Sequence, residues 1–180
     1  IKKLLEYGTD HNIQWVIAEA QMWLATFHAK RSENTKGMAL LDKVLISAKE
    51  MNYLRLLGRA HNAKAILLSF QDKHYLAQQE YLKAFEIFKN YPGDPYLSKI
   101  SSNIAVIFTD MELWKKAQEY NNQAIDFYHQ TNIKSAQQLA SFHINAAYIE
   151  KHLTDDDSDI KQKAHLDLAL KYAKDSGIIR

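Results

Sequence analysis

Histidine is the residue type in this chain with the most direct potential for chemistry, because it can bind a transition metal or carry a proton near neutral pH. The chain has eight histidines and no cysteine. No two histidines stand four residues apart, and no HExxH motif occurs. The pattern therefore predicts no metal site. We expect the histidines on the surface or between helices, at His11, His28, His61, His74, His129, His143, His152 and His165.

A second candidate is the acidic stretch 155–159, whose carboxylates alternate as they do in a calcium-binding loop. Such a loop needs glycine at its sixth position and glutamate at its twelfth, but Ile160 and Leu166 stand there. The stretch is more typical of a loop that ends at a helix start, where carboxylates interact favourably with the positive end of the helix. We interpret it as structural.

Motifs for catalysis and cofactor binding are absent from the sequence. It has no glycine-rich phosphate loop, no nucleophile elbow and no dinucleotide-binding fingerprint. Acidic and basic residues are scattered as they usually are on helix surfaces. We therefore predict that the chain is not an enzyme and that it uses no cofactor.

Composition narrows the fold and the partners. Of 180 residues, 47% are hydrophobic, whereas glycine occurs 5 times and proline twice, which favours a helical chain with a substantial core. Lysine and arginine number 23 against 21 acidic residues, and the charges are interspersed. The absence of a basic stripe argues against nucleic-acid binding. No apolar run reaches the roughly 18 residues of a membrane span, and the first residues do not resemble a signal peptide.

The elements that would position any functional residue follow a repeat of about 40 residues. Residues able to end a helix recur at Asn12, Asn52, Pro92-Gly93, Asn132 and Gly177. Small residues recur in the same register in three columns, which are Ala25, Ala65, Ala105 and Ala147, then Gly37, Ala77 and Ala117, then Val44, Ala84, Ala124 and Ala169. Three columns in phase predict an array of helical hairpins.

The repeat predicts where each helix lies. We expect the first helices of the hairpins near 13–31, 53–71, 95–110 and 134–152. The second helices are expected near 34–50, 73–90, 112–130 and 158–175. This gives one domain over 1–180, with repeats at about 13–52, 53–92, 93–133 and 134–177. Residues 1–12 would end a preceding helix and Ile178-Ile179-Arg180 would start a further repeat, so we expect an excerpt of a longer protein.

The columns resemble those of the tetratricopeptide repeat (TPR), a helix-turn-helix unit with small residues where its helices cross. Ala77-x3-Tyr81-x2-Ala84 matches the second-helix motif, and Ala117-x6-Ala124 matches it with Asn121 in place of the usual aromatic residue. Asn103-Ile104-Ala105-x2-Phe108 matches the first-helix motif. The resemblance implies an all-α solenoid of antiparallel helix pairs in a right-handed superhelix.

The chain also departs from the usual repeat. Its period is 40 rather than 34 residues, Gly37 and Val44 replace alanines, and the fourth repeat has an insertion at 154–159. Long-period arrays of this kind resemble those of kinesin light chains, of peptide-responsive bacterial regulators, and of the sensor regions of bacterial histidine kinases and GGDEF diguanylate cyclases. The stretch 91–125 resembles the last group most in its general sequence character, although no single motif carries this resemblance.

The resemblance also implies a binding groove, because the first helices of a TPR array line its concave face. Asparagine amides there suit an extended peptide backbone, cations suit a carboxylate, and apolar side chains supply anchors. The alternative is that these residues only pack or face solvent. The predicted groove positions are Met22, Trp23, Thr26, Arg59, Asn62, Ile66, Lys99, Ser102, Asn103, Val106, Asn145 and Tyr148, with Glu19 and Ser141 beside them.

The function that follows is non-catalytic recognition of a protein or peptide, without contact to nucleic acid or membrane and with a homodimer possible. The resemblance favours the sensory or input region of a bacterial signalling protein, such as a diguanylate cyclase or histidine kinase. A cytoplasmic scaffold or a peptide-responsive transcriptional regulator is the alternative. The first role would place the chain in the periplasm and the second in the cytoplasm.

Overall fold

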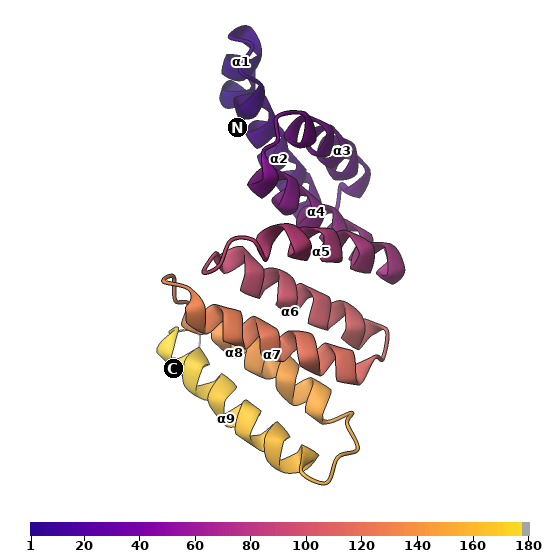
Figure 1. Ribbon diagram of the computed structural model, residues 1–180, viewed down its shortest axis with the longest axis vertical. Helices are drawn as coiled ribbons and strands as arrows, with labels where there is room; N and C mark the ends of the chain where they lie inside the picture. Colours follow the sequence, from indigo (N-terminus) through magenta and orange to yellow (C-terminus); the bar gives the residue numbers. More distant parts are fainter. Residues whose placement is uncertain (178–180) are drawn as a thin grey trace. The chain divides into compact units, whose positions relative to one another are not determined.

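The computed structural model describes residues 1–177, and within them every regular element is an α-helix (Figure 1). The helices in this described part of the chain are nine: α1 (Lys2–Asp10), α2 (Gln14–Lys30), α3 (Asn34–Glu50), α4 (Leu54–Ser69), α5 (His74–Phe88), α6 (Pro95–Asp110), α7 (Trp114–Gln130), α8 (Ala136–Glu150) and α9 (Ser158–Asp175). Each of the eight predicted helices has bounds within two residues of an observed one. The all-α, TPR-like repeat of antiparallel helix pairs is confirmed.

The chain divides into two compact units. Unit 1 is Ile1–Phe88 and holds α1 to α5, while unit 2 begins at Lys89 and holds α6 to α9. In unit 1, α2 packs on α3, α3 on α4, and α4 on α5; in unit 2 the same succession runs from α6 to α9. The single domain expected over 1–180 stays a prediction. The expected start of a further repeat at Ile178-Ile179-Arg180 lies outside the described residues.

Turns between helices recur every 20 residues through most of the chain. Asn12, Ser32, Asn52, Asp72 and Glu112 all have φ between 51° and 59°, the left-handed region. At each of them the next residue's N–H binds a carbonyl five residues back, as in Tyr53 N to Ala48 O at 2.8 Å, so the last carbonyls of each helix are satisfied. The expected ends at Asn12, Asn52, Gly93 and Gly177 are confirmed by their positive φ.

The expectation that Asn132 ends its helix in the left-handed conformation is wrong. Asn132 is not among the residues with positive φ, and α7 ends where Thr131 turns into extended backbone at φ −82° and ψ 151°. The ammonium of Lys134 binds the carbonyl oxygens of Tyr128 and His129 at 2.8 and 3.0 Å. A side-chain cation therefore satisfies the end of α7, so no left-handed residue is needed.

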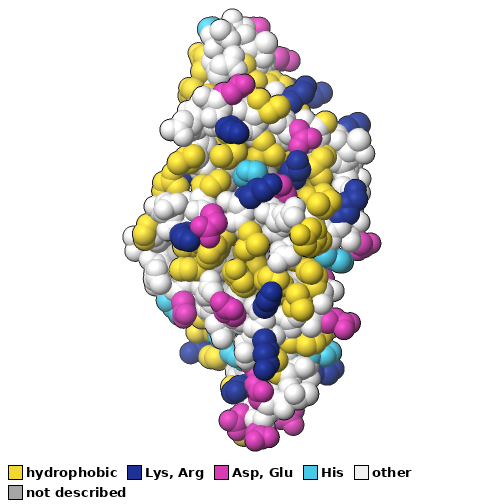
Figure 2. Space-filling model, turned by 45° about the vertical axis from the view of Figure 1, so that its right-hand side comes forward, with side chains coloured by type: hydrophobic (Ala, Val, Ile, Leu, Met, Phe, Trp, Pro, Cys, Tyr) yellow, Lys and Arg dark blue, Asp and Glu magenta, His cyan; other side chains and the backbone are white. Residues whose placement is uncertain are grey.

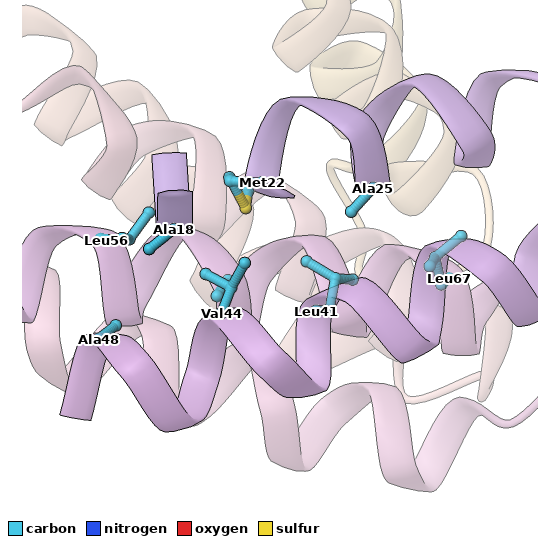
Figure 3. Packing of buried hydrophobic residues seen from close by; sticks show 9 residues of the cluster. Ala18, Met22, Ala25, Leu41, Val44, Ala48, Leu56 and Leu67 are labelled. Carbon is cyan, nitrogen blue, oxygen red and sulfur yellow. The ribbon is translucent and has the colours of Figure 1, made fainter. Parts of the chain in front are cut away.

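Small residues hold the helices of each unit close together. In unit 1 the core cluster joins α2, α3 and α4, and Figure 3 shows Met22 and Ala25 of α2 on the side that faces Val44 and Leu41 of α3. The predicted column residues Ala25, Ala65, Ala105 and Ala147 are each at most 2% exposed. Ala77, Ala84, Ala117 and Ala124 are fully buried. The repeat columns are thus the positions where helices cross.

Local sequence explains how the first helix of unit 2 begins. Asp94 is the N-cap of α6 and accepts a hydrogen bond from Tyr96 N at 2.9 Å, with Pro95 in the first turn. Ser135 caps α8 in the same way through Gln138 N. These caps define where α6 and α8 begin, and these two helices carry the predicted groove residues of unit 2. Within residues 1–177, no helix has the length and apolar composition that crossing a membrane requires.

Candidate functional site: a hollow between two first helices

Three predicted groove residues lie together in unit 2. Lys99, Ser102 and Asn103 of α6 line a hollow of about 420 Å3, which we call the unit-2 hollow. It is completed by Pro95 and Tyr96 at the start of α6 and by Gln138 and Phe142 of α8. The first helices of two consecutive repeats therefore form its walls, as the predicted concave face requires.

The unit-2 hollow combines a cation, amides and an aromatic ring. Lys99 is exposed, and its ammonium lies 5.6 Å from the centre of the Tyr96 ring. The Gln138 amide reaches Ser98 Oγ at 3.4 Å, which links α8 to α6 at the rim. Such a lining can hold a peptide backbone through amides and a carboxylate through the ammonium.

Other predicted groove residues of unit 2 lie outside this hollow. Val106 and Tyr148 are 40% and 51% exposed, and Asn145 is half-buried. The Tyr148 ring meets the Trp114 ring edge to face, with 6.2 Å between the ring centres, and its centre lies 4.9 Å from that of His152. Tyr148 therefore packs in an aromatic cluster with Trp114 and His152. Sequence reasoning missed Gln138 and Phe142 because their approach depends on how α8 is rotated against α6. It also missed Tyr96, although Tyr96 stands three residues before Lys99 on α6 and helical spacing could have found it.

In unit 1 the predicted cation is already paired within the protein. Arg59 Nη1 donates to both carboxylate oxygens of Glu19, at 2.9 and 3.1 Å. The Tyr53 hydroxyl donates to the same carboxylate at 3.2 Å. Burial and the neighbouring Glu19 raise the pKa of Tyr53. The guanidinium thus joins the first helices α2 and α4.

The apolar and amide positions of unit 1 differ in exposure. Met22 belongs to the core cluster and is 7% exposed, and Asn62 is 4% exposed, so both offer little surface to a ligand. Trp23 is 55% exposed. Thr26 and Ile66 line a second hollow of about 700 Å3, the unit-1 hollow, with Ala29, Lys30, Ser32, Asn34 and Phe70. Whether any groove residue binds a ligand stays a prediction.

Several histidines lie between helices, as expected. His61 Nδ1 is 2.6 Å from a Glu80 oxygen and His28 Nδ1 is 2.8 Å from a Glu33 oxygen. Hydrogen bonds from Lys36, His28 and Arg31 lower the pKa of Glu33 to about 2. Burial of Glu80 opposes its ionisation, but hydrogen bonds from His61 and Lys83 lower its pKa to about 2. In the part of the chain that the structure describes, no group of three or more metal-binding side chains comes together.

Charge is not segregated on the surface that can be inspected. Figure 2 shows lysine and arginine interspersed with aspartate and glutamate over most of one face, with hydrophobic side chains between them. A phosphate backbone requires a continuous basic track. On the face drawn in Figure 2, acidic and hydrophobic side chains interrupt the basic ones.

Comparison with known proteins identifies the repeat. Residues 56–130, from α4 to α7, match the sequence model of the tetratricopeptide repeat. The chain contains a TPR region. The crystal structure of BtubC (BKLC) from P. vanneervenii is similar to the chain with a TM-score of 0.81 at 15% identity, covering 93% of this chain and 67% of that one. At this identity the likeness shows the fold alone. No curated protein matches the chain in sequence.

The TPR match supports a general function. Such repeats bind proteins and peptides and are typically non-catalytic. The predicted protein-binding helical repeat is confirmed at this level. The match covers most of α4, the first helix of the second repeat, which carries Arg59 and Ile66. It also covers α6, the first helix of the third repeat, which carries Lys99 and Asn103.

Proposed function

We propose that this chain binds a protein or peptide along its first helices and that the unit-2 hollow is the main polar contact. The observation that carries the proposal is the meeting of Lys99, Ser102 and Asn103 with Tyr96 and Gln138 in one hollow. Solenoid repeats offer a curved, extended surface suited to a polypeptide.

The lining indicates what the ligand presents. The Lys99 ammonium lies 5.6 Å from the centre of the Tyr96 ring and has no carboxylate partner among the residues that the structure describes, so it is available to a ligand carboxylate. The amides of Asn103 and Gln138 can donate to peptide carbonyls and accept from peptide N–H groups. The ligand is therefore an extended segment with an acidic group.

Selection of peptides from a randomised library tests this proposal. We expect the selected peptides to bind the chain with at least tenfold lower affinity when Lys99→Met is combined with Asn103→Ala, while the melting temperature changes little. Lys115→Met with Asn122→Ala, both exposed on α7, is the matched control. Unchanged affinity in the first variant would reject the unit-2 hollow as the contact.

The resemblance of the long-period repeat to bacterial sensor regions supports a finer role, in which peptide binding acts as the input of a bacterial signalling protein. A scaffold or a peptide-responsive transcriptional regulator is the alternative. The two differ in the domains encoded beside this chain. A membrane span followed by a GGDEF or kinase domain would support the input role, and a DNA-binding domain or further repeats would support the alternative.

A further inference from the structure

The two units place different residues at one equivalent position. Asn34 and Trp114 are the first residues of α3 and α7, the second helices of their repeats, and stand 80 positions apart (114 − 34). Each faces the end of the next first helix. Counted from the crossing residues Ala65 and Ala147, Ile66 corresponds to Tyr148 and Phe70 to His152, each with an offset of 82 (148 − 66 and 152 − 70).

In unit 2 this position is filled from within. The Trp114 indole stacks on the His152 ring at 4.2 Å with an interplanar angle of 7°. It also meets Tyr148 edge to face at 6.2 Å. The space between the start of one second helix and the end of the next first helix therefore accommodates an aromatic ring in this fold.

In unit 1 the same position is left open. Asn34 is too short to cover Ile66 and Phe70, and the unit-1 hollow of about 700 Å3 lies between them. Phe70 is 67% exposed although it lines the hollow. An exposed aromatic side chain beside an apolar hollow is typical of a surface that a partner covers.

Asn34 adds a polar feature to this hollow. Its Oδ1 atom is shielded from solvent and has no hydrogen-bond partner in the structure. Buried carbonyl oxygens without a donor are rare, because water or protein groups usually satisfy them. A rotation of the Asn34 side chain that turns Oδ1 into the hollow would let a ligand N–H or O–H group supply the missing donor.

We propose that the unit-1 hollow binds an aromatic side chain of the protein ligand, with its ring against Ile66 and Phe70 and its N–H or O–H donating to Asn34 Oδ1. The bound ring takes the place that Trp114 occupies in unit 2. This inference rests on the protein-binding function proposed above and adds to it a subsite of defined chemistry. It is separate from the unit-2 hollow, which provides the cation.

A nuclear magnetic resonance titration with N-acetyl-tryptophanamide tests the subsite. We expect saturable shifts of the backbone amides of Thr26, Ala29, Ser32 and Phe70. Asn34→Trp fills the hollow from within and should weaken binding of the probe at least tenfold. Asn122→Trp, an equal substitution at an exposed position of α7, should leave binding unchanged.

Two further comparisons separate the roles of ring and donor. Methylation of the indole nitrogen of the probe should weaken its binding to the original chain severalfold but not its binding to Asn34→Leu. Phe70→Ser removes a mostly exposed ring, so we expect this variant to fold and to bind the probe more weakly. It replaces Asn34→Trp as the test if Asn34→Trp fails to fold.

Shifts that do not saturate, or binding that is unchanged in both Asn34→Trp and Phe70→Ser, would overturn the subsite. If the probe fails while library-selected peptides still bind through Lys99 and Asn103, the subsite is rejected and the protein-binding function stands. If the selected peptides are insensitive to the unit-2 variants but lose binding in Asn34→Trp, the subsite is supported and the unit-2 contact is rejected.

Discussion

Arg59 and Glu19 stand 40 residues apart (59 − 19) and form an ion pair in which one guanidinium nitrogen contacts both carboxylate oxygens. Their side chains are only 21% and 16% exposed. The pair joins the first helices of two consecutive repeats at positions where the sequence predicts ligand contact. It therefore links α2 to α4 and leaves the Arg59 charge less available to a ligand.

Removing one partner of this pair should be costly. We expect Glu19→Ala to lower the free energy of unfolding by about 1–3 kcal/mol, because it leaves Arg59 half-buried without its carboxylate. The double variant with Arg59→Ala should lose less than the sum of the two single losses. Chemical denaturation measures this. Asp42→Ala, which breaks the more exposed pair with Lys64, is the control and should cost less than about 1 kcal/mol.

Acid should weaken unit 2 through His143. Its Nδ1 lies 3.0 Å from His165 Nδ1, and its ring stacks on Tyr172 at 5.6 Å. Burial, then the charges of His165 and His129, lower the pKa of His143 from 6.5 to about 4, and burial lowers the pKa of His165 although Glu150 opposes this. The unfolded chain therefore holds more protons than the folded chain between these values.

The contribution of His143 to the free energy of unfolding should consequently be fully present above about pH 6.5 and be lost as the pH drops towards 4. At about 1.4 kcal/mol per pKa unit, the loss is roughly 3 kcal/mol at most. Denaturation curves recorded from pH 7.5 to 4.5 measure the slope. His143→Phe keeps an aromatic ring and should flatten the slope, whereas His11→Gln, at an exposed position, should not. Equal slopes in all three chains would contradict the assignment.

Gly58 allows α4 to approach α5. A Cβ atom at Gly58 would lie 2.7 Å from Phe88 Cε2, and Phe88 is fully buried and cannot turn away without disturbing the core. We expect Gly58→Ala to lower the melting temperature and to cost about 1–3 kcal/mol despite the better helix propensity of alanine. Gly37→Ala meets its nearest atom, Leu67 Cδ1, at 3.1 Å and should cost less. The reverse order would show that the contact at Gly58 relaxes easily.

Asn121 links α7 to α8 from a site that is 1% exposed. Its Nδ2 donates to Phe142 O at 3.1 Å. Asn121→Asp keeps the shape but places a carboxylate against that carbonyl oxygen, so we expect a loss of about 2–4 kcal/mol at pH 7 that shrinks as acid protonates the new group. Asn122→Asp, one residue away and exposed, should change stability by less than about 0.5 kcal/mol. Similar losses for the two variants would argue against the buried hydrogen bond.

The fold could be predicted because local requirements repeat along the chain. Asparagine and glycine tolerate the left-handed backbone that Asn52 and Gly93 adopt, and only small residues fit where helices cross, as at Ala65 and Ala105. The left-handed turn at Glu112 gave no such signal, because glutamate has no preference for that conformation. There the 2.8 Å hydrogen bond from Leu113 N to Phe108 O accompanies the turn.

The site could be predicted only along single helices. Helical spacing placed Lys99, Ser102 and Asn103 on one face of α6, and the structure gathers them in one hollow. The partners from other helices depend on inter-helix rotation and side-chain pairing, which spacing does not encode. Gln138 joins the unit-2 hollow for this reason, and Arg59 faces Glu19 for the same reason.

The 20-residue spacing of the turns makes each repeat broad. A repeat of 40 residues has six more than the usual 34, about three for each helix, or roughly 4–5 Å of added helix length. Helices α2, α3 and α7 each have 17 residues and so span about 25 Å. A polypeptide bound as proposed across the first helices could therefore shift sideways by nearly one helical turn and still be in contact with them. We expect side chains such as Lys99 and Asn103 to fix its position.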